Sequence, residues 1–211
     1  MKVKVKICGI TRKEDALLAC EHGAFALGFV FAESPRQITM DKAREIIKTL
    51  PEPLLSVGVF VNESLTTILQ HIEQTQITAV QLHGHESAQF ISELKSRTPE
   101  TIVIKSIGVN EVGLVQNPDD FNDLDYFLFD SMESRRDWPT RPLILWKTLR
   151  HLRLNKPYFV AGGLNSENVI EIIKDLHPYG VDVSSGVEYE IGKKNPGAVR
   201  NFIRCVGADY V

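Results

Sequence analysis

The segment KVKICGITRKEDALLACEHGAFALGFVF (residues 4–31) has the pattern of a strand, a helix and a second strand. KVKICG alternates apolar and polar side chains, and FALGFVF is a short apolar run, which are both patterns of buried strands. Between them, Thr11 and Glu14 have the spacing of a capping box that opens a helix. Two strands joined by a helix predict a parallel pair with a right-handed crossover.

The strand pattern recurs along the rest of the chain. The further runs are LLSVGVFV (54–61), AVQLHG (79–84), TIVIKSIG (101–108), YFLFDS (126–131), YFVAGG (158–163) and GVDVSSG (180–186). An open, doubly wound sheet is one way to arrange them. Eight units of about 25 residues, with nothing left for a second domain, instead favour a (β/α)8 barrel. We therefore expect an α/β protein with a single (β/α)8 TIM barrel domain over residues 1–211.

Helix signals separate these runs. Thr39 is suited to cap one helix, Ser64 opens another, and Asn165 or Ser166 opens a third. The expected helices after the first one are DKAREIIKTL (41–50), LTTILQHIEQ (65–74), ESAQFISELKS (86–96), VNEVGLVQNPDDFNDL (109–124), ENVIEIIKDL (167–176) and PGAVRNFIRCV (196–206). The segment 109–124 is expected to be helical although it contains Gly and Pro.

Composition and charge exclude several classes of protein. The chain has 211 residues and a formal net charge of −3, which argues against a general nucleic-acid binder. The cysteines Cys8, Cys20 and Cys205 are odd in number and lack CxxC spacing, so neither a disulfide framework nor a metal site is indicated. Charges alternate from Lys2 to Lys6, unlike a signal peptide, and no apolar run is long enough to span a membrane. We expect a cytoplasmic protein, a monomer or weak homodimer, without nucleic-acid or membrane partners.

Strand alternation places a thiol and a carboxylate in one cavity. Side chains alternate between the two faces of a strand, so Lys6 and Cys8 should point to the barrel axis. The same argument directs Asp130 to the axis at the end of its own strand. Active sites of these barrels lie at the C-terminal ends of the strands, where both residues stand. A neighbouring ammonium group, here that of Lys6, favours the thiolate form of a cysteine.

Cys8 and Asp130 also have purely structural interpretations. A free cysteine is usually an inert, buried side chain, and Cys20 and Cys205 are expected to be of this kind. An aspartate at the end of a strand often only caps the next element.

Glycine-rich loops end the last two strands. AGG (161–163) and SSG (184–186) follow strands seven and eight, where barrel enzymes commonly bind phosphate. Backbone N–H groups at glycines approach an anion closely, so we expect Gly162, Gly163, Ser185 and Gly186 to bind phosphate. The alternative is that these glycines only form tight turns. Neither the Walker pattern GxxxxGK[ST] nor the dinucleotide pattern GxGxxG occurs.

Two further side chains lie at strand ends. Arg36, in SPR after strand two, is suited to bidentate binding of a carboxylate or phosphate, although a solvated loop arginine is equally plausible. His83, in QLHG, is either a base or hydrogen-bond donor for a substrate or a structural histidine. We include His83 and Lys6 with the candidate substrate-binding residues.

Together these motifs resemble the phosphoribosylanthranilate isomerase family of the tryptophan pathway. The resemblance runs along nearly the whole chain in VKICGIT, GFVF with SPR, SVGVFVN, VQLHG, FDS, AGGLNSENV and GVDVSSGVE, in family order and spacing.

The resemblance implies a cofactor-free Amadori rearrangement. In it, a phosphorylated aminoaldose, N-(5'-phosphoribosyl)anthranilate, becomes a 1-amino-1-deoxyketose phosphate, which makes the protein an aldose–ketose isomerase of amino-acid biosynthesis. Cys8 matches the family's general base and Asp130 its general acid. Arg36 matches the residue that holds the anthranilate carboxylate, and the two glycine loops match the phosphate site.

The chain departs from the family pattern after strand six. The family usually carries a stretch close to GGTGxxFDW there, whereas this chain has FDSMESRRDWPTRPLILWKTL (129–149). Arg135, Arg136 and Arg141, with two prolines, replace the glycines of this loop, and prolines would stiffen it. The departure leaves two alternatives open: an isomerase for another phosphorylated aminosugar, and a non-catalytic barrel that binds a phosphorylated ligand.

Overall fold

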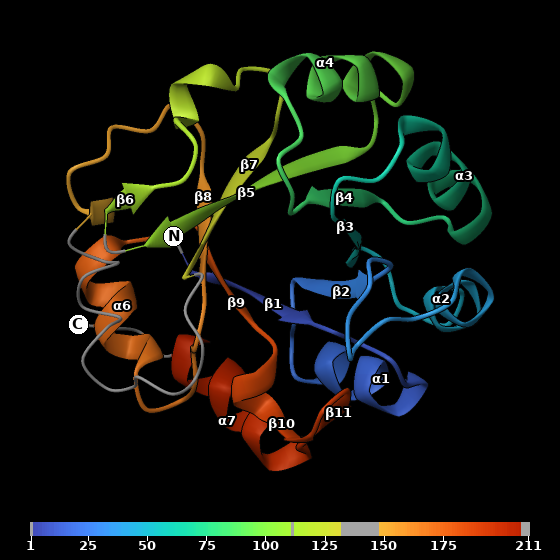
Figure 1. Cartoon of the computed structure of the whole chain (residues 1–211). Helices are drawn as coiled ribbons and strands as arrows, with labels where there is room; N and C mark the ends of the chain where they lie inside the picture. Colours follow the sequence, from blue (N-terminus) through green and yellow to red (C-terminus); the bar gives the residue numbers. More distant parts are fainter. Residues whose placement is uncertain (1, 111, 132–147, 208–211) are drawn as a thin grey trace.

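Eight parallel strands close into a barrel with helices on its outside (Figure 1). The computed structural model describes residues 2–110, 112–131 and 148–207. The barrel strands are β1 (Lys4–Cys8), β2 (Ala26–Val30), β3 (Leu55–Phe60), β4 (Ala79–Leu82), β5 (Ile102–Asn110), β7 (Tyr126–Ser131), β8 (Tyr158–Ala161) and β9 (Gly180–Val183). Each pairs in parallel with its neighbours, and the pairing of β4 with β5 completes the ring. The predicted TIM barrel is confirmed.

Helices connect the strands and cover the barrel. They are α1 (Lys13–Glu21), α2 (Met40–Ile47), α3 (Leu65–Thr75), α4 (Ala88–Arg97), α6 (Val169–Leu176) and α7 (Pro196–Gly207). Two of the predicted caps form, because the Thr39 side chain accepts from the backbone N–H of Lys42, and Ser64 accepts from that of Thr67. These hydrogen bonds satisfy amide donors that have no partner within the helix.

One predicted helix cap is wrong, and another helix begins later than predicted. Arg12, not Thr11, is the N-cap of α1 and forms no side-chain cap, so the predicted capping box does not form. Thr11 instead donates its hydroxyl to the carbonyl of Gly192, far along the chain. The last crossover helix, α6, begins at Val169 rather than at residue 167. The predicted cap still forms, because the Asn165 side chain accepts the backbone N–H groups of Glu167 and Asn168, and its carbonyl accepts that of Val169.

The segment 109–124 is not the predicted α-helix. β5 runs on to Asn110, and β6 (Gly113–Leu114) pairs back onto it in antiparallel fashion. The Asn110 side chain accepts from the backbone N–H groups of Val112 and Gly113, which favours a turn over a helix. A single turn of 3-10 helix, η1 (Pro118–Asp120), follows.

The core has two layers, one outside the strands and one inside the barrel. Val5, Ile7, Phe127 and Phe129 belong to the outer layer against the helices, as the alternation predicted. The inner layer is a smaller apolar cluster formed by Ala26, Val57, Ala79, Ile104, Leu128, Phe159 and Ala161. Two residues further along β4 and β5, on the same face, the side chains become polar, at Gln81 and Ser106. The barrel is therefore apolar at one end and polar toward the C-terminal ends of its strands.

A short hairpin follows β9 and returns to β1. After the 3-10 turn η3 (Ser185–Val187), β10 (Glu188–Glu190) pairs with β11 (Lys193–Lys194). This hairpin lies beside α1 and α7 at the rim of the barrel (Figure 1). The atypical segment with Arg135, Arg136 and Arg141 lies outside the described residues.

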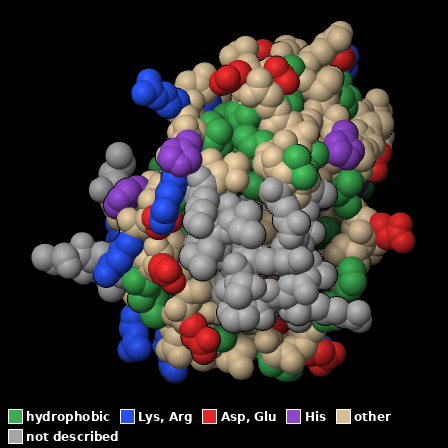
Figure 2. Space-filling model, turned by 60° about the vertical axis from the view of Figure 1, so that its left-hand side comes forward, with side chains coloured by type: hydrophobic (Ala, Val, Ile, Leu, Met, Phe, Trp, Pro, Cys, Tyr) green, Lys and Arg blue, Asp and Glu red, His purple; other side chains and the backbone are tan. Residues whose placement is uncertain are grey.

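The surface carries charges of both signs. On the face in Figure 2, the described Lys and Arg side chains lie mostly along one edge, and acidic and apolar side chains are spread over the remainder. Among the described residues, no helix combines the length and the apolar character that a membrane crossing requires. The same residues contain no group of three or more His, Cys, Asp or Glu side chains placed to hold a metal ion.

Candidate active site

A buried ion pair lies at the centre of the candidate site. Lys6 Nζ is 2.9 Å from Asp182 Oδ2, and the two side chains are 0% and 8% exposed. Burial opposes the charge on Lys6, but charge interactions and hydrogen bonds with Asp182 and Cys8 outweigh burial and raise the pKa of the lysine. The other oxygen, Asp182 Oδ1, has no hydrogen-bond partner in the described structure. This pair places fixed charges of both signs inside the barrel.

Cys8 and Asp130 both interact with this ion pair. Cys8 ends β1 two residues after Lys6, and Asp130 lies near the end of β7. Lys6 and Asp182 change the pKa of each of them through charge. The two residues singled out from the sequence are therefore brought together at the mouth of the barrel.

Asp130 has a strongly raised pKa. Loss of solvation, aided by the negative charge of Asp182 and opposed by the charge of Lys6, raises the pKa to about 7. Its side chain is still 29% exposed, so the carboxyl group can be reached from the mouth. Near neutral pH, a substantial fraction of Asp130 therefore carries a proton that it can donate.

The pKa of the Cys8 thiol differs from expectation, because burial outweighs the nearby positive charges. Lys6 does lower its pKa, as the sequence suggested, and so does Lys194. Burial acts more strongly in the opposite direction, with Asp182 adding to it, so the pKa of the thiol is raised. In the free protein Cys8 is mainly a thiol at neutral pH, and the lysines limit the cost of forming the thiolate.

His83 lies between a buried amide and Asp130. Its Nδ1 is 3.1 Å from Gln81 Nε2, and its Nε2 is 3.5 Å from Asp130 Oδ2. Because the amide nitrogen of Gln81 donates to Nδ1, the ring proton belongs on Nε2, which faces the carboxyl group. Burial, aided by the charge of Lys6, lowers the pKa of His83, so the ring is neutral near pH 7.

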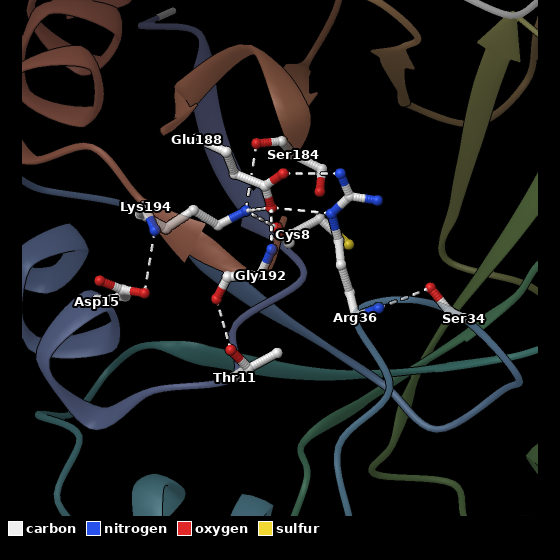
Figure 3. Close-up of polar contacts among 9 residues, drawn as sticks. All are labelled: Cys8, Thr11, Asp15, Ser34, Arg36, Ser184, Glu188, Gly192 and Lys194. Carbon is white, nitrogen blue, oxygen red and sulfur yellow. Dashed lines mark hydrogen bonds and ion pairs between the residues drawn. The ribbon is translucent and has the colours of Figure 1, made fainter. Parts of the chain in front are cut away.

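Arg36 reaches the site but already has a partner. Its Nε and Nη2 donate to the two carboxylate oxygens of Glu188, at 2.8 and 2.7 Å. The guanidinium group lies beside the sulfur of Cys8 in Figure 3. A second cation, Lys194, donates to Glu188 from the other side at 2.9 Å. The sequence analysis missed Asp182, Glu188 and Lys194, although alternation within GVDV would have directed Asp182 to the axis with Lys6.

The two glycine loops lie against each other. Gly162 and Gly163 follow β8 directly and have positive φ angles of 94° and 63°. Ser185 and Gly186 form the 3-10 turn after β9. A side chain at Gly186 would meet the carbonyl group of Leu164, so the two loops approach closely only because this residue is glycine. The two loops predicted to bind phosphate thus touch each other at Gly186 and Leu164.

Comparison with known proteins identifies the family. The family model for N-(5'-phosphoribosyl)anthranilate (PRA) isomerase matches residues 5–205. The N-(5'-phosphoribosyl)anthranilate isomerase of Bacillus cereus (strain B4264) is 45% identical over 203 residues, covering 95% of this chain and 96% of that protein.

Solved structures agree with this match. The crystal structure of phosphoribosyl anthranilate isomerase from Thermotoga maritima has a TM-score of 0.83 and 37% identity, over 97% of this chain and 98% of that one. An isomerase in complex with reduced 1-(o-carboxyphenylamino)-1-deoxyribulose 5-phosphate has a TM-score of 0.77 and 39% identity, with the same coverage. With a thiol and a protonatable carboxyl group at the mouth of the same barrel, the chain belongs to the N-(5'-phosphoribosyl)anthranilate isomerase family.

Proposed function

We propose that Asp130 is the general acid and Cys8 the general base of an isomerase acting on N-(5'-phosphoribosyl)anthranilate in tryptophan biosynthesis. The observation that carries this assignment is the position of both groups beside the Lys6–Asp182 ion pair, with the pKa of Asp130 at about 7. A group with a pKa near the working pH is the most effective proton donor.

The first step opens the sugar ring. Asp130 gives its proton to the ring oxygen of the ribose, the bond between this oxygen and C1 breaks, and the nitrogen lone pair forms a C1–N double bond. The product is an open-chain iminium ion, and Asp130 is left as a carboxylate. The Nε2–H group of His83, 3.5 Å from Asp130 Oδ2, supports the carboxylate that this step creates.

The second step moves a proton from carbon. The thiolate of Cys8 removes the proton from C2, and the electrons of that bond form a C1–C2 double bond while the iminium nitrogen becomes neutral. The resulting enolamine takes up a proton at C1 as its C2 hydroxyl group becomes a ketone. The substrate gains one proton from Asp130 and loses one to Cys8, with the iminium nitrogen as the electron sink. Proton exchange with water then returns Asp130 to the acid and Cys8 to the thiolate for the next turnover.

Substrate binding in this proposal uses the rim of the barrel. Arg36 binds the anthranilate carboxylate with the N–H groups that Glu188 leaves unused. The backbone of Gly162, Gly163, Ser185 and Gly186 binds the phosphate group, an interaction for which closely packed glycine loops are well suited.

Turnover of variants tests the acid–base assignment. Cys8→Ala and Asp130→Asn should each lower kcat by about 10²–10⁴-fold, because each removes a proton-transfer group. The rate is measured by the loss of substrate fluorescence. Cys20→Ala, which alters a partly buried cysteine on α1 away from the site, is the control and should keep the wild-type rate. Near wild-type turnover of either site variant would show that the assignment is wrong.

We also propose a cytoplasmic protein that is a monomer or a weak homodimer. Free cysteines at Cys8, Cys20 and Cys205 are compatible with a reducing compartment. The large apolar side chains that are exposed among the described residues belong to several separate elements: Leu17, Val61, Val112, Val115, Tyr189 and Ile191. Light scattering after size exclusion measures the mass in solution.

A further inference from the structure

The hairpin after β9 carries a buried ionic network that the acid–base steps do not use. Glu188 and Lys194 are 3% and 0% exposed, and together with Arg36 they form a cation–anion–cation series (Figure 3). Burial alone would raise the pKa of Glu188, but hydrogen bonds from Arg36 and the charge of Lys194 lower it overall. Glu188 therefore remains an anion over the physiological pH range.

We propose that Glu188, held in place by Lys194, is a positioning residue that orients Arg36 toward the carboxylate of the substrate. This inference rests on the proposed role of Arg36. A guanidinium group has five N–H donors, and Glu188 takes the one on Nε and one on Nη2. Of the three remaining donors, one on Nη1 and one on Nη2 point along the edge between these two atoms. That edge is a second planar fork, with the geometry that a carboxylate accepts.

Lys194 fixes the position of Glu188 relative to the strands. Its ammonium group donates to the carbonyl of Cys8 at 2.6 Å and to that of Ser184 at 3.2 Å, as well as to Glu188. Cys8 is the last residue of β1 and Ser184 directly follows β9, so the lysine connects the hairpin to both strands. Its own backbone N–H donates to the buried carboxylate of Asp15 on α1.

Arg36 is held along its whole length. A Cβ atom at Gly9 would lie 2.6 Å from Arg36 Cδ, so the arginine stem crosses the backbone where only glycine leaves room. The backbone N–H of Arg36 donates to the Ser34 side chain. With the stem fixed here and one edge of the guanidinium fixed by Glu188, substrate binding does not have to order a flexible side chain.

The network also limits the positive charge beside Cys8. Without Glu188, Arg36 and Lys194 would be two neighbouring cations without a compensating anion. Lys194 has a pKa already lowered by burial, an effect that Glu188 opposes. Orientation, rather than added charge, is therefore the contribution that we assign to Glu188.

Kinetics of Glu188→Gln tests the proposal. This variant keeps the size of the side chain but loses the anion, so Arg36 is no longer held on two atoms. We expect KM to rise roughly five- to tenfold, the cost of ordering one long side chain on binding. The value of kcat should change less than KM, because Cys8 and Asp130 themselves are retained.

Two controls separate positioning from a structural effect. Glu190→Gln removes a glutamate of the same hairpin that pairs with Lys193 at the surface, and it should leave KM unchanged. In an Arg36→Ala background, adding Glu188→Gln should raise KM no further, because the residue through which Glu188 acts is gone. Equal effects of Glu188→Gln with and without Arg36 would overturn the proposal.

Binding of analogues adds a readout independent of turnover. Glu188→Gln should weaken binding of reduced 1-(o-carboxyphenylamino)-1-deoxyribulose 5-phosphate, measured by calorimetry, but not that of the matching phenylamino compound without the carboxylate. If Arg36→Ala leaves both affinities unchanged, the proposed role of Arg36 is wrong. If Arg36→Ala weakens the first affinity and Glu188→Gln does not, only the role of Glu188 is wrong. Should Glu188→Gln fold poorly, Glu188→Asp keeps the charge, shortens the reach and should also raise KM.

Discussion

At the scale of single residues, the raised pKa of Asp130 suits proton donation but lowers the free energy of unfolding at alkaline pH. Its pKa in the folded protein is about 7, whereas an aspartate in an unfolded chain has a value of about 3.9. Between these values the folded state holds a proton that the unfolded state has lost, so the free energy of unfolding falls as the pH rises through this range. Above pH 7 the ionised carboxylate is a persistent cost to the fold.

Asp130→Asn should therefore stabilise the protein at alkaline pH while lowering kcat by about 10²–10⁴-fold, as expected for loss of the general acid. The gain in unfolding free energy over wild type should reach about 2–4 kcal/mol near pH 8.5 and vanish near pH 4, because only the ionised carboxylate is unfavourable. Urea unfolding at several pH values measures it. Asp120→Asn, at an exposed position in η1, should show no such trend. The same gain at pH 4 and pH 8.5 would mean that ionisation is not the cause.

The sequence predicted some of these residues and not others, for a physical reason. Alternation along a strand directs Cys8 and Asp130 to the axis, because it depends only on local backbone geometry. The balance between burial and charge at Cys8 depends on Lys194, which lies 186 residues away along the chain. The partner of Arg36, Glu188, is also far away in sequence, at 152 residues. Such pairings form only when the barrel closes, so no local sequence pattern predicts them.

At the scale of elements, a glycine on β2 leaves room for Cys8 where β1 and β2 approach closely. Cys8 is paired with Gly28 across these strands. A Cβ atom at Gly28 would lie 2.6 Å from Cys8 Sγ and 3.1 Å from Cys8 Cα. The glycine therefore leaves the space that the thiol occupies.

Gly28→Ala should displace the thiol and strain both strands. We expect a loss of about 1–3 kcal/mol in unfolding free energy, typical of an overpacked core, together with a lower kcat. In a Cys8→Ala background the loss of stability should shrink, because the sulfur is gone. Gly197→Ala, near the start of α7, meets only the side chain of Asn195 at 3.3 Å and should change stability little. An equal loss with and without Cys8 would contradict the packing argument.

Elements with strong apolar patterns were predicted well, and the exception has a local cause. The barrel strands coincide with the apolar runs because each run is buried between two layers of side chains. The segment 109–124 was wrongly predicted as a helix, although its sequence contains the reason. The Asn110 side chain binds two backbone N–H groups, and Gly113 has a φ of +133°, so a turn forms where a helix would have to begin.

At the scale of the whole molecule, a further buried ion pair, between Lys105 and Glu86, connects three consecutive barrel units. Lys105 on β5 donates to Glu86 at 2.8 Å and to the carbonyl of Gly84 at 2.6 Å. Glu86 also accepts from the backbone N–H groups of Asn62, after β3, and Gly84, after β4. The pair lies at the rim where β4 and β5 meet, close to His83 in the sequence. Neither Lys105 nor Glu86 takes part in the proposed chemistry.

Glu86→Gln should accordingly destabilise the whole barrel more than it alters the chemical steps. It leaves the buried ammonium of Lys105, whose pKa burial already lowers, without its anion, and breaking one side of such a pair costs about 3–5 kcal/mol. Urea unfolding measures the loss. The matched control is Glu93→Gln, which breaks an exposed pair with Arg97 on α4 and should cost less than about 1 kcal/mol. Adding Lys105→Met to Glu86→Gln should recover part of the stability, because the unpaired charge is then removed. A loss below about 1 kcal/mol for Glu86→Gln would mean that strand pairing and the apolar layers hold this rim without the ion pair.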